Sequence, residues 1–368
     1  MKRIQSIDMI RGFCIFLMVL GHVIDWWVIL DQRWWVNILF NFLAPIAATG
    51  FLFISGFSAA LAYKSSVRKA MTSSDTTMHY TRNIYLIRAL LLLVISFLYN
   101  TAVAIGTSDP RWIWAWNALQ TISISLLLAW PLLRTSIYLR LALGIGLLIV
   151  NELLFPILSP FEDQTNLYGV LYHFFYNPIE AFTLLAYFAM FIIGSAFGDF
   201  FYNINSIQDQ EERKNSIKTI FLRAIFIIGI IFTTFGIVYR FYDFLTRRTI
   251  SSMFYSIGAV LLLLAILIYL EEFEKINPKK RYRFFFYYSF YSFTIYIAHD
   301  PLYFLFYQQL NQLLVWVAAI ILYVLLTLLL RILHKKVGSK ASLKTQLGIL
   351  SFIIAKRIEQ RKSKKIEN

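Results

Sequence analysis

The feature that most constrains the fold is a series of apolar runs of about twenty residues, separated by short charged loops, in a chain that is 59% hydrophobic. A helix rises about 1.5 Å per residue, so a run of this length spans the hydrocarbon core of a bilayer. The sequence therefore predicts an all-α polytopic membrane protein of about ten transmembrane helices, in one domain (1–335) with a basic amphipathic tail (336–368). We place the spans near residues 10–30, 37–62, 84–106, 116–133, 139–156, 181–202, 219–239, 251–270, 285–307 and 313–334.

The basic residues sort to one side of these spans. With an inward N-terminus, the outer loops contain only five of the 35 Lys and Arg residues, namely Arg33, Arg111, Arg240, Arg247 and Arg248. The positive-inside rule therefore predicts that the N-terminus and the C-terminus are both cytosolic. The net charge of +15 is then a topology signal, so the partner we expect is the lipid bilayer and not a nucleic acid.

Several local features refine this topology. The basic and apolar start resembles a signal peptide, but Trp26, Trp27 and Leu30 offer no small-residue cleavage site, so we expect a retained helix. The single cysteine, Cys14, permits no intrachain disulfide. The aromatic segment 157–180 is expected outside, as an interfacial helix or lid, and the tail from Ala341 is expected to lie on the inner leaflet and then fray.

The first span carries a stripe of ionisable residues. Arg11 and His22 are eleven residues apart, which on a helix gives an azimuth difference of about 20° and an axial separation of about 16 Å. Asp8 and Asp25 fall within about 60° of the same face. An ionisable group at the bilayer centre costs about 2.5 to 3.5 kcal/mol, so such groups face a protein interior or a wet cavity and mark function.

Histidine is the natural general base near neutral pH, which makes His22 the candidate catalytic base. Asp25, three residues later on the same face, is in position to orient its imidazole. The alternative is a packed histidine bonded to a backbone carbonyl. For Asp8 and Arg11 the alternatives are a helix-terminal ion pair or a contact to a phosphate- or thioester-bearing cofactor that enters from the cytosol.

Other candidate residues follow on the second and third spans. Most inner basic residues, such as Arg82, act as topology determinants, whereas Arg88 lies inside a span and is costly there. Either arginine offers a fork that suits phosphate. The small residues around Ser55 and Gly56 allow close approach either of another helix or of a ligand.

The ninth span contains a second histidine, His299, followed by Asp300 and Pro301. Counted from the inner side, His299 reaches about the depth of His22, so both could border a single cavity. Pro301 frees a backbone carbonyl, which is tolerated beside a cavity or a polar partner. No spacing of Cys or His resembles a zinc site and no glycine-rich phosphate loop is present, so we expect no metal.

These motifs together resemble the transmembrane acyltransferase superfamily, which joins acyltransferase family 3 to the heparan-alpha-glucosaminide N-acetyltransferase catalytic domain. The most specific element is the pattern of an arginine, ten residues and a histidine within RIQSIDMIRGFCIFLMVLGH, residues 3–22. Weaker elements are FISGF at 53–57, the arginine-bearing third span, WNALQTISISLLLA at 116–129 and SFTIYIAH at 292–299. The resemblance covers most of residues 3–305.

The resemblance implies an enzyme that takes an acetyl group from acetyl-CoA on the cytosolic side and passes it to a sugar or glycan acceptor at or beyond the membrane. It implies that His22 is catalytic, with Arg11 as its partner or as a contact to the donor. Arg82 and Arg88 match the arginines of the family's third span only loosely, because their spacing is wider. The plasma or inner membrane is the expected location.

Two rival classes use the same stripe. In a proton-coupled transporter, Arg11, His22 and Asp25 would form a relay, although the stripe has no counterpart later in the chain, as an inverted repeat would provide. In a membrane scaffold the stripe would be dispensable. The sequence leaves open whether the acetyl group first binds a histidine, with His299 as the second group, and whether the chain forms a homo-oligomer.

Overall fold

The computed structural model describes residues 4–72, 78–176, 182–241, 243, 248–273 and 283–367. Within these ranges the chain is helical, and its only extended pairing is an isolated bridge between Val28 and Leu310. Nine helical stretches of the described part are long and apolar enough to cross a membrane. The prediction of an all-α, multi-pass membrane protein is confirmed.

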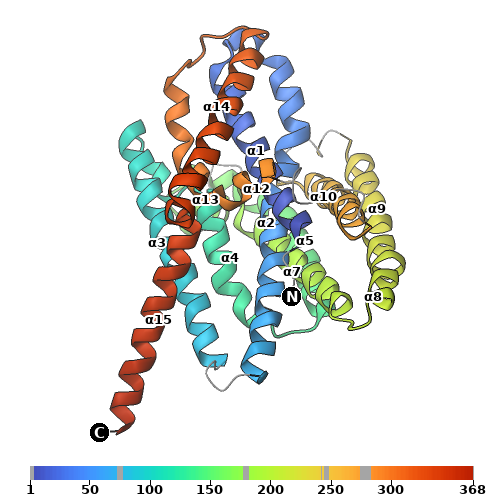
Figure 1. Cartoon of the computed structure of the whole chain (residues 1–368). Coiled ribbons are helices and arrows are strands. Elements are labelled where there is room, and N and C mark those ends of the chain that lie inside the picture. The colour runs from blue at the N-terminus through green and yellow to red at the C-terminus, as the bar shows by residue number, and fades with distance from the viewer. Residues whose placement is uncertain are drawn as a thin grey trace.

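The helices follow in the order shown by the colours of Figure 1. The first half of the chain contains α1 (Gln5–Trp27), η1 (Leu30–Gln32), α2 (Trp34–Thr72), α3 (Met78–Thr107), η2 (Pro110–Trp114), α4 (Ala118–Leu132), α5 (Ile137–Leu158), η3 (Ser159–Phe161) and α6 (Leu167–Phe175). The second half contains α7 (Leu184–Asn205), α8 (Gln210–Ser216), the π-helical η4 (Ile217–Leu222), α9 (Arg223–Tyr239), α10 (Ile250–Glu272), α12 (Arg283–Phe290), α13 (Ser292–Ala298), η6 (Asp300–Phe304), α14 (Leu314–Lys336), η7 (Gly338–Ala341) and α15 (Leu343–Glu367).

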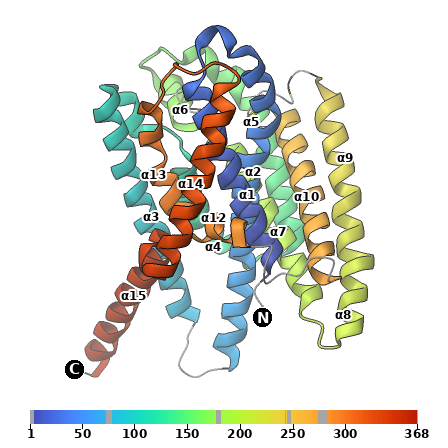
Figure 2. The ribbon, with the colours of Figure 1, turned by 45° about the horizontal axis from the view of Figure 1, so that its top comes forward.

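The helices form a bundle around α1, α2 and α7. The pair α9 and α10 stands on one side of this centre, and α3 with α15 stands on the opposite side (Figures 1 and 2). The N-terminus and the C-terminus lie toward the same end of the bundle, and α6 lies at the other end (Figure 2). On which side of a membrane this end lies stays a prediction from the charge distribution of the sequence.

Local sequence signals explain where several helices begin. Asn117 accepts a hydrogen bond from the backbone at the start of α4, and Ser136, Asn166 and Thr249 do the same for α5, α6 and α10. Such side-chain caps satisfy amide groups that have no partner within the helix. The helix boundaries therefore follow from polar residues placed at the ends of apolar runs.

Glycine allows α2 and α7 to approach closely. A Cβ atom added at Gly56 would lie 1.9 Å from the carbonyl oxygen of Phe191, and one added at Gly194 would lie 2.0 Å from that of Phe53. Any larger residue would overlap the neighbouring backbone at these positions. Of the two uses that the sequence left open for Gly56, the structure shows helix packing.

The predicted ninth span, 285–307, is not one continuous helix. It is divided into α12, α13 and η6. Pro301 lies in the first turn of η6, where its missing N–H prevents an α-helix from continuing through this point. The ninth predicted pass is thus a broken segment, and its break is adjacent to His299.

The two regions outside the spans also take definite forms. In segment 157–180 the described residues form η3 and the short helix α6, which is joined to α5 through a hydrogen bond of 2.9 Å from the Tyr176 hydroxyl to the Asn151 carbonyl. Residues 177–180 lie outside the described ranges. The tail forms α15, which extends to Glu367 and packs on α3, where the rings of Tyr80 and Phe352 are 6.0 Å apart.

Candidate active site

The inner half of the α1 stripe faces other helices. Arg11 donates a hydrogen bond of 2.6 Å to the hydroxyl of Ser58 on α2, and its other terminal nitrogen lies 3.5 Å from the carboxylate of Asp8. Asp8 is buried and also accepts a hydrogen bond of 3.2 Å from Ser289 on α12. The stripe therefore looks into the protein at this level, and the ion pair predicted between Asp8 and Arg11 is present.

A second arginine faces Arg11 from α3. Arg88 is partly buried and lies close enough to Arg11 for the two like charges to repel. No carboxylate of the described residues lies within ion-pair distance of Arg88, and its other electrostatic neighbour is the hydroxyl of Tyr85. Two guanidinium groups therefore lie near each other at this level, and the carboxylate of Asp8 contacts that of Arg11.

The outer half of the stripe brings two histidines together. The ring centroids of His22 and His299 are 5.1 Å apart, although the residues lie on α1 and just after α13. The indole of Trp26 lies 5.0 Å from the His22 ring and stacks on the His299 ring at 5.8 Å. His22 is exposed whereas His299 is buried. One side of His22 is therefore not covered by protein, and the buried His299 ring lies on another side of it.

Backbone hydrogen bonds join the two segments that carry His22 and His299. The amide of Gln308 donates to the Trp26 carbonyl at 2.9 Å, and the amide of Leu310 donates to the Trp27 carbonyl at 2.9 Å. Gln308 has a φ of 54°, a left-handed conformation that costs a non-glycine residue of the order of 1 kcal/mol or more. The indole of Trp27 also donates to the Leu302 carbonyl at 2.7 Å. The end of α1 and the segment after α13 are therefore fixed to each other.

At the level of the two histidines, Asp25 contacts Arg33, whereas the sequence predicted that it orients the His22 imidazole. Both side-chain oxygens of Asp25 contact Arg33, at 3.0 and 2.9 Å, in an ion pair at the rim. The carboxylate beside a histidine is that of Asp300, which lies 3.5 Å from Nε2 of His299 and accepts a hydrogen bond from Tyr99 on α3. No sequence signal pointed to Tyr99, because a tyrosine in an apolar helix is common, and Asp300 was noted only because it follows His299.

The remaining predicted site residues lie apart from the histidines. Ser55 donates to the Phe51 carbonyl of its own helix at 2.7 Å, and Gly56 packs on α7. Arg82, near the start of α3, contacts the His79 ring at 2.9 Å. In the described part of the chain no three His, Cys, Asp or Glu residues come together as metal ligands.

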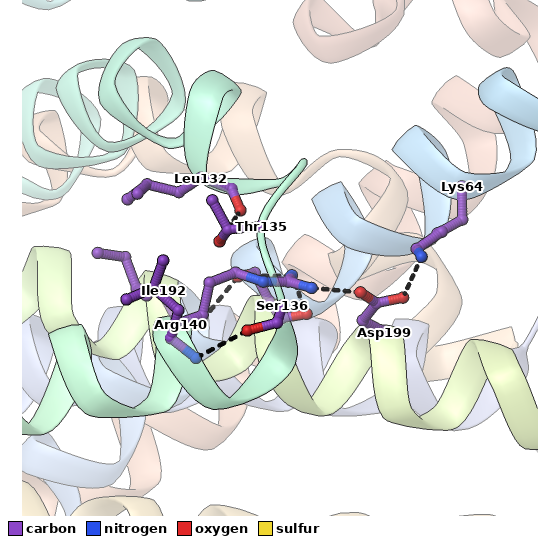
Figure 3. Close-up of polar contacts among 9 residues, drawn as sticks. Lys64, Leu132, Thr135, Ser136, Arg140, Ile192 and Asp199 are labelled. Carbon is purple, nitrogen blue, oxygen red and sulfur yellow. Dashed lines mark hydrogen bonds and ion pairs between the residues drawn. The ribbon is translucent and has the colours of Figure 1, made fainter.

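A second buried charge cluster was not anticipated. Arg140 of α5 is fully buried, donates to the carbonyl of Ser195 at 3.0 Å and contacts the carboxylate of Asp199 on α7. Lys64 of α2 contacts the other oxygen of Asp199 at 3.1 Å, so that Asp199 lies between the two cations (Figure 3). We call these three residues the charge triad. It joins α2, α5 and α7, and every one of its charges has a partner.

An apolar groove of about 440 Å³ lies on the opposite face of α1, where Phe16 and Leu20 line it together with residues of α12 and α14. Helical spacing places Phe16 about 140° from Arg11. This groove is therefore separate from the polar stripe, and the hydroxyl of Tyr323, which lines it, donates to the Phe16 carbonyl at 2.7 Å. The stripe and not the groove is the candidate active site.

Comparison with known proteins identifies the family of the chain. The family model described as an acyltransferase domain, that of acyltransferase family 3, matches residues 4–334. That range begins at the start of α1 and ends within α14, and it includes Arg11, His22, Arg88 and His299. No individually curated protein matches the chain.

Proposed function

The chain belongs to acyltransferase family 3, and from this premise we propose that it transfers an acetyl group from acetyl-CoA to a hydroxyl or amine of a sugar or glycan acceptor. The observation that supports this proposal best is the exposed imidazole of His22, 5.1 Å from a second imidazole and on the same helix face as Arg11. In this proposal the donor enters from the cytosolic end, and transfer takes place at the outer half of α1.

The donor would bind at the level of Arg11 and Arg88. Acetyl-CoA carries several phosphate charges, and the neighbouring guanidinium groups of Arg11 and Arg88 would favour an anion. Arg82 lies one to two turns nearer the start of α3 and would meet phosphates on the inner side. The axial distance from Arg11 to His22 is about 16 Å, which the flexible pantetheine arm would span so that the thioester reaches the histidines.

His22 acts as the general base in this proposal. It removes a proton from the acceptor while the acceptor oxygen or nitrogen attacks the thioester carbonyl carbon. A thiolate leaves readily, so one base suffices for the chemical step. A variant in which a histidine first carries the acetyl group uses the same two rings, with His299 as the second group.

The proposal also assigns a location. The nine long apolar helices make the chain a multi-pass membrane protein. We propose the plasma or inner membrane, with both termini in the cytosol, because thirty of the 35 Lys and Arg residues then lie on the cytosolic side. Such an arrangement gives the donor site access to cytosolic acetyl-CoA and the acceptor site access to the outer surface.

The direct test is transfer of labelled acetyl from acetyl-CoA by the purified protein, with a panel of sugars as acceptors. His22→Gln should lower turnover by about 10²- to 10⁴-fold, the contribution typical of a general base. The control is His173→Gln in α6, where the histidine ring contacts the Glu162 carbonyl at 2.7 Å and the ring of Tyr172. Unchanged turnover in folded His22→Gln would contradict the proposal. Substrate flux into proteoliposomes without coenzyme A would favour the transporter.

A further inference from the structure

The surroundings of His299 define which of its nitrogens is free to take a proton. Nδ1 lies 2.6 Å from the carbonyl oxygen of Tyr296, which can only accept, so Nδ1 carries a hydrogen and donates it. Tyr296 is in the last turn of α13, where carbonyl groups lack helical partners. In the neutral ring the lone pair is therefore on Nε2.

The free Nε2 faces a carboxylate. Oδ1 of Asp300 lies 3.5 Å from this nitrogen, and Oδ2 of the same carboxylate accepts a hydrogen bond from the hydroxyl of Tyr99. Tyr99 belongs to α3 and its ring also contacts Tyr296, with centroids 5.9 Å apart. Asp300 is thus held between the segment that carries His299 and a separate helix.

This arrangement suits a histidine that is neutral at rest and charged only during turnover. The ring of His299 is 4% exposed, and burial disfavours a permanent charge. A fixed carboxylate at Nε2 stabilises the imidazolium once a proton arrives. The other titratable groups whose rings contact the His299 ring are His22 on α1, at 5.1 Å, and Tyr296 on α13, at 5.7 Å. Asp25 and Arg33 neutralise each other in an ion pair.

We propose that Asp300, held by Tyr99, is a positioning residue that makes His299 the proton relay of the acyl transfer. This inference rests on the proposed function. The acceptor hydroxyl oxygen bonds to the thioester carbon, and the hydroxyl proton passes to His22 and then to Nε2 of His299. The carbon–sulfur bond of the thioester breaks. The departing thiolate takes the proton from His299. One proton moves from oxygen to sulfur, so no further reactant is needed.

The experiment compares pH–rate profiles of Asp300→Asn and Tyr99→Phe with that of the wild-type protein. Asp300→Asn should lower kcat by about 10- to 100-fold with little change in KM for acetyl-CoA, because the imidazolium loses its carboxylate. The relay works only while His299 is neutral, so activity falls at low pH. Without Asp300 the ring takes up its proton at lower pH, and the acid limb of the profile should move to lower pH.

Tyr99→Phe removes a single hydrogen bond to Asp300, so kcat should fall by about 3- to 10-fold. The matched control is Tyr172→Phe on α6, which removes another tyrosine–carboxylate hydrogen bond, of 3.0 Å to Glu162, and does not involve His22 or His299. Burial and this bond raise the pKa of Tyr172 to about 12, so it stays protonated in the wild-type protein. Tyr172→Phe should leave the profile unchanged.

A measurement without substrate separates this inference from the proposed function. Nitrogen NMR of labelled histidine should show that the His299 ring of the resting wild-type protein titrates at higher pH than the same ring in Asp300→Asn. Identical titration, or a wild-type kcat and acid limb in Asp300→Asn, would overturn the relay. If wild-type protein transfers no acetyl group, the proposed function fails, whereas the NMR result still decides whether Asp300 controls His299.

Discussion

The charge triad and the stripe of α1 are both buried sets of charges, but they are compensated differently. In the triad, one carboxylate lies between two cations, and the fully buried Arg140 has its carboxylate and a backbone carbonyl as partners. In the stripe, Arg11 contacts Asp8 at 3.5 Å, and Arg88 has no carboxylate partner among the described residues. The triad is compensated within the protein, whereas the neighbouring guanidinium groups of Arg11 and Arg88 are the site that we propose for an external anion.

This difference separates structural from functional charge. A buried charge without a partner is costly, so a protein keeps one only where a ligand or a reaction uses it. Buried polar residues in a membrane helix are therefore insufficient evidence for a site. The informative observation is a charge that the protein does not neutralise, or a titratable ring that remains exposed, as His22 does.

The largest effect on stability should come from breaking the triad. Asp199→Ala leaves Arg140 buried beside Lys64 without a carboxylate, and the expected loss in the free energy of unfolding is about 3 to 5 kcal/mol. The double replacement Arg140→Met with Asp199→Leu removes both buried charges and should restore most of that stability. Thermal unfolding in detergent measures both, and a stable Asp199→Ala protein would show that the triad is not structural.

Arg88→Ala should act on the donor and not on the fold. Loss of one charge-assisted contact of about 1.5 to 3 kcal/mol weakens coenzyme A binding by about 10- to 150-fold. The unfolding temperature should not fall, since the replacement removes an uncompensated charge. Equilibrium binding of coenzyme A is the measurement, with Lys218→Ala on the exposed side of η4 as the control. Unaltered affinity in Arg88→Ala would remove the donor site from this level.

Gly56→Ala tests the packing that supports the triad. The added Cβ would lie 1.9 Å from the Phe191 carbonyl oxygen, so α2 and α7 must separate, and overpacking of this kind costs about 1 to 3 kcal/mol. Gly146→Ala is the matched control, because nothing lies within 4 Å of the added atom there. Equal stability of the two variants would contradict the close contact of α2 with α7.

The smallest effect on stability is expected for the ion pair between Asp25 and Arg33. Asp25 and Arg33 form a partly exposed ion pair, so Asp25→Asn and Arg33→Gln should each change stability by less than about 1 kcal/mol. Both variants should also leave the rate of acetyl transfer close to that of the wild-type protein. A large loss of kcat in Asp25→Asn alone would mean that Asp25 orients His22, as the sequence spacing suggested.

The sequence predicted the features that depend on the geometry of a single helix. The apolar runs gave the helical spans, and the eleven-residue spacing placed Arg11 and His22 on one face because helix geometry is local. The shared depth of His22 and His299 also followed from counting residues along two spans. Helix geometry therefore placed the two histidines at one depth, and it left open whether they border a single cavity.

What depends on the choice of neighbouring helices could not be predicted. Asp25 has Arg33 as its partner because the chain turns back after α1, and Tyr99 reaches Asp300 because α3 lies beside α13. The pairing of Arg140 with Asp199 likewise requires α5 to lie against α7. Pro301 indicated the helix break next to His299. The hydrogen bond from His299 to the Tyr296 carbonyl depends on the geometry of that break, so it could not be predicted.

The central claim is that a thioester donor lies along the stripe of α1 and reaches His22. A cysteine introduced at that position tests it without knowledge of the acceptor. In a Cys14→Ala background, His22→Cys should react with a thiol reagent, and acetyl-CoA should slow that reaction, whereas a His173→Cys control should react equally with and without acetyl-CoA. The account predicts protection at position 22 only, and equal labelling of His22→Cys with and without saturating acetyl-CoA would contradict it.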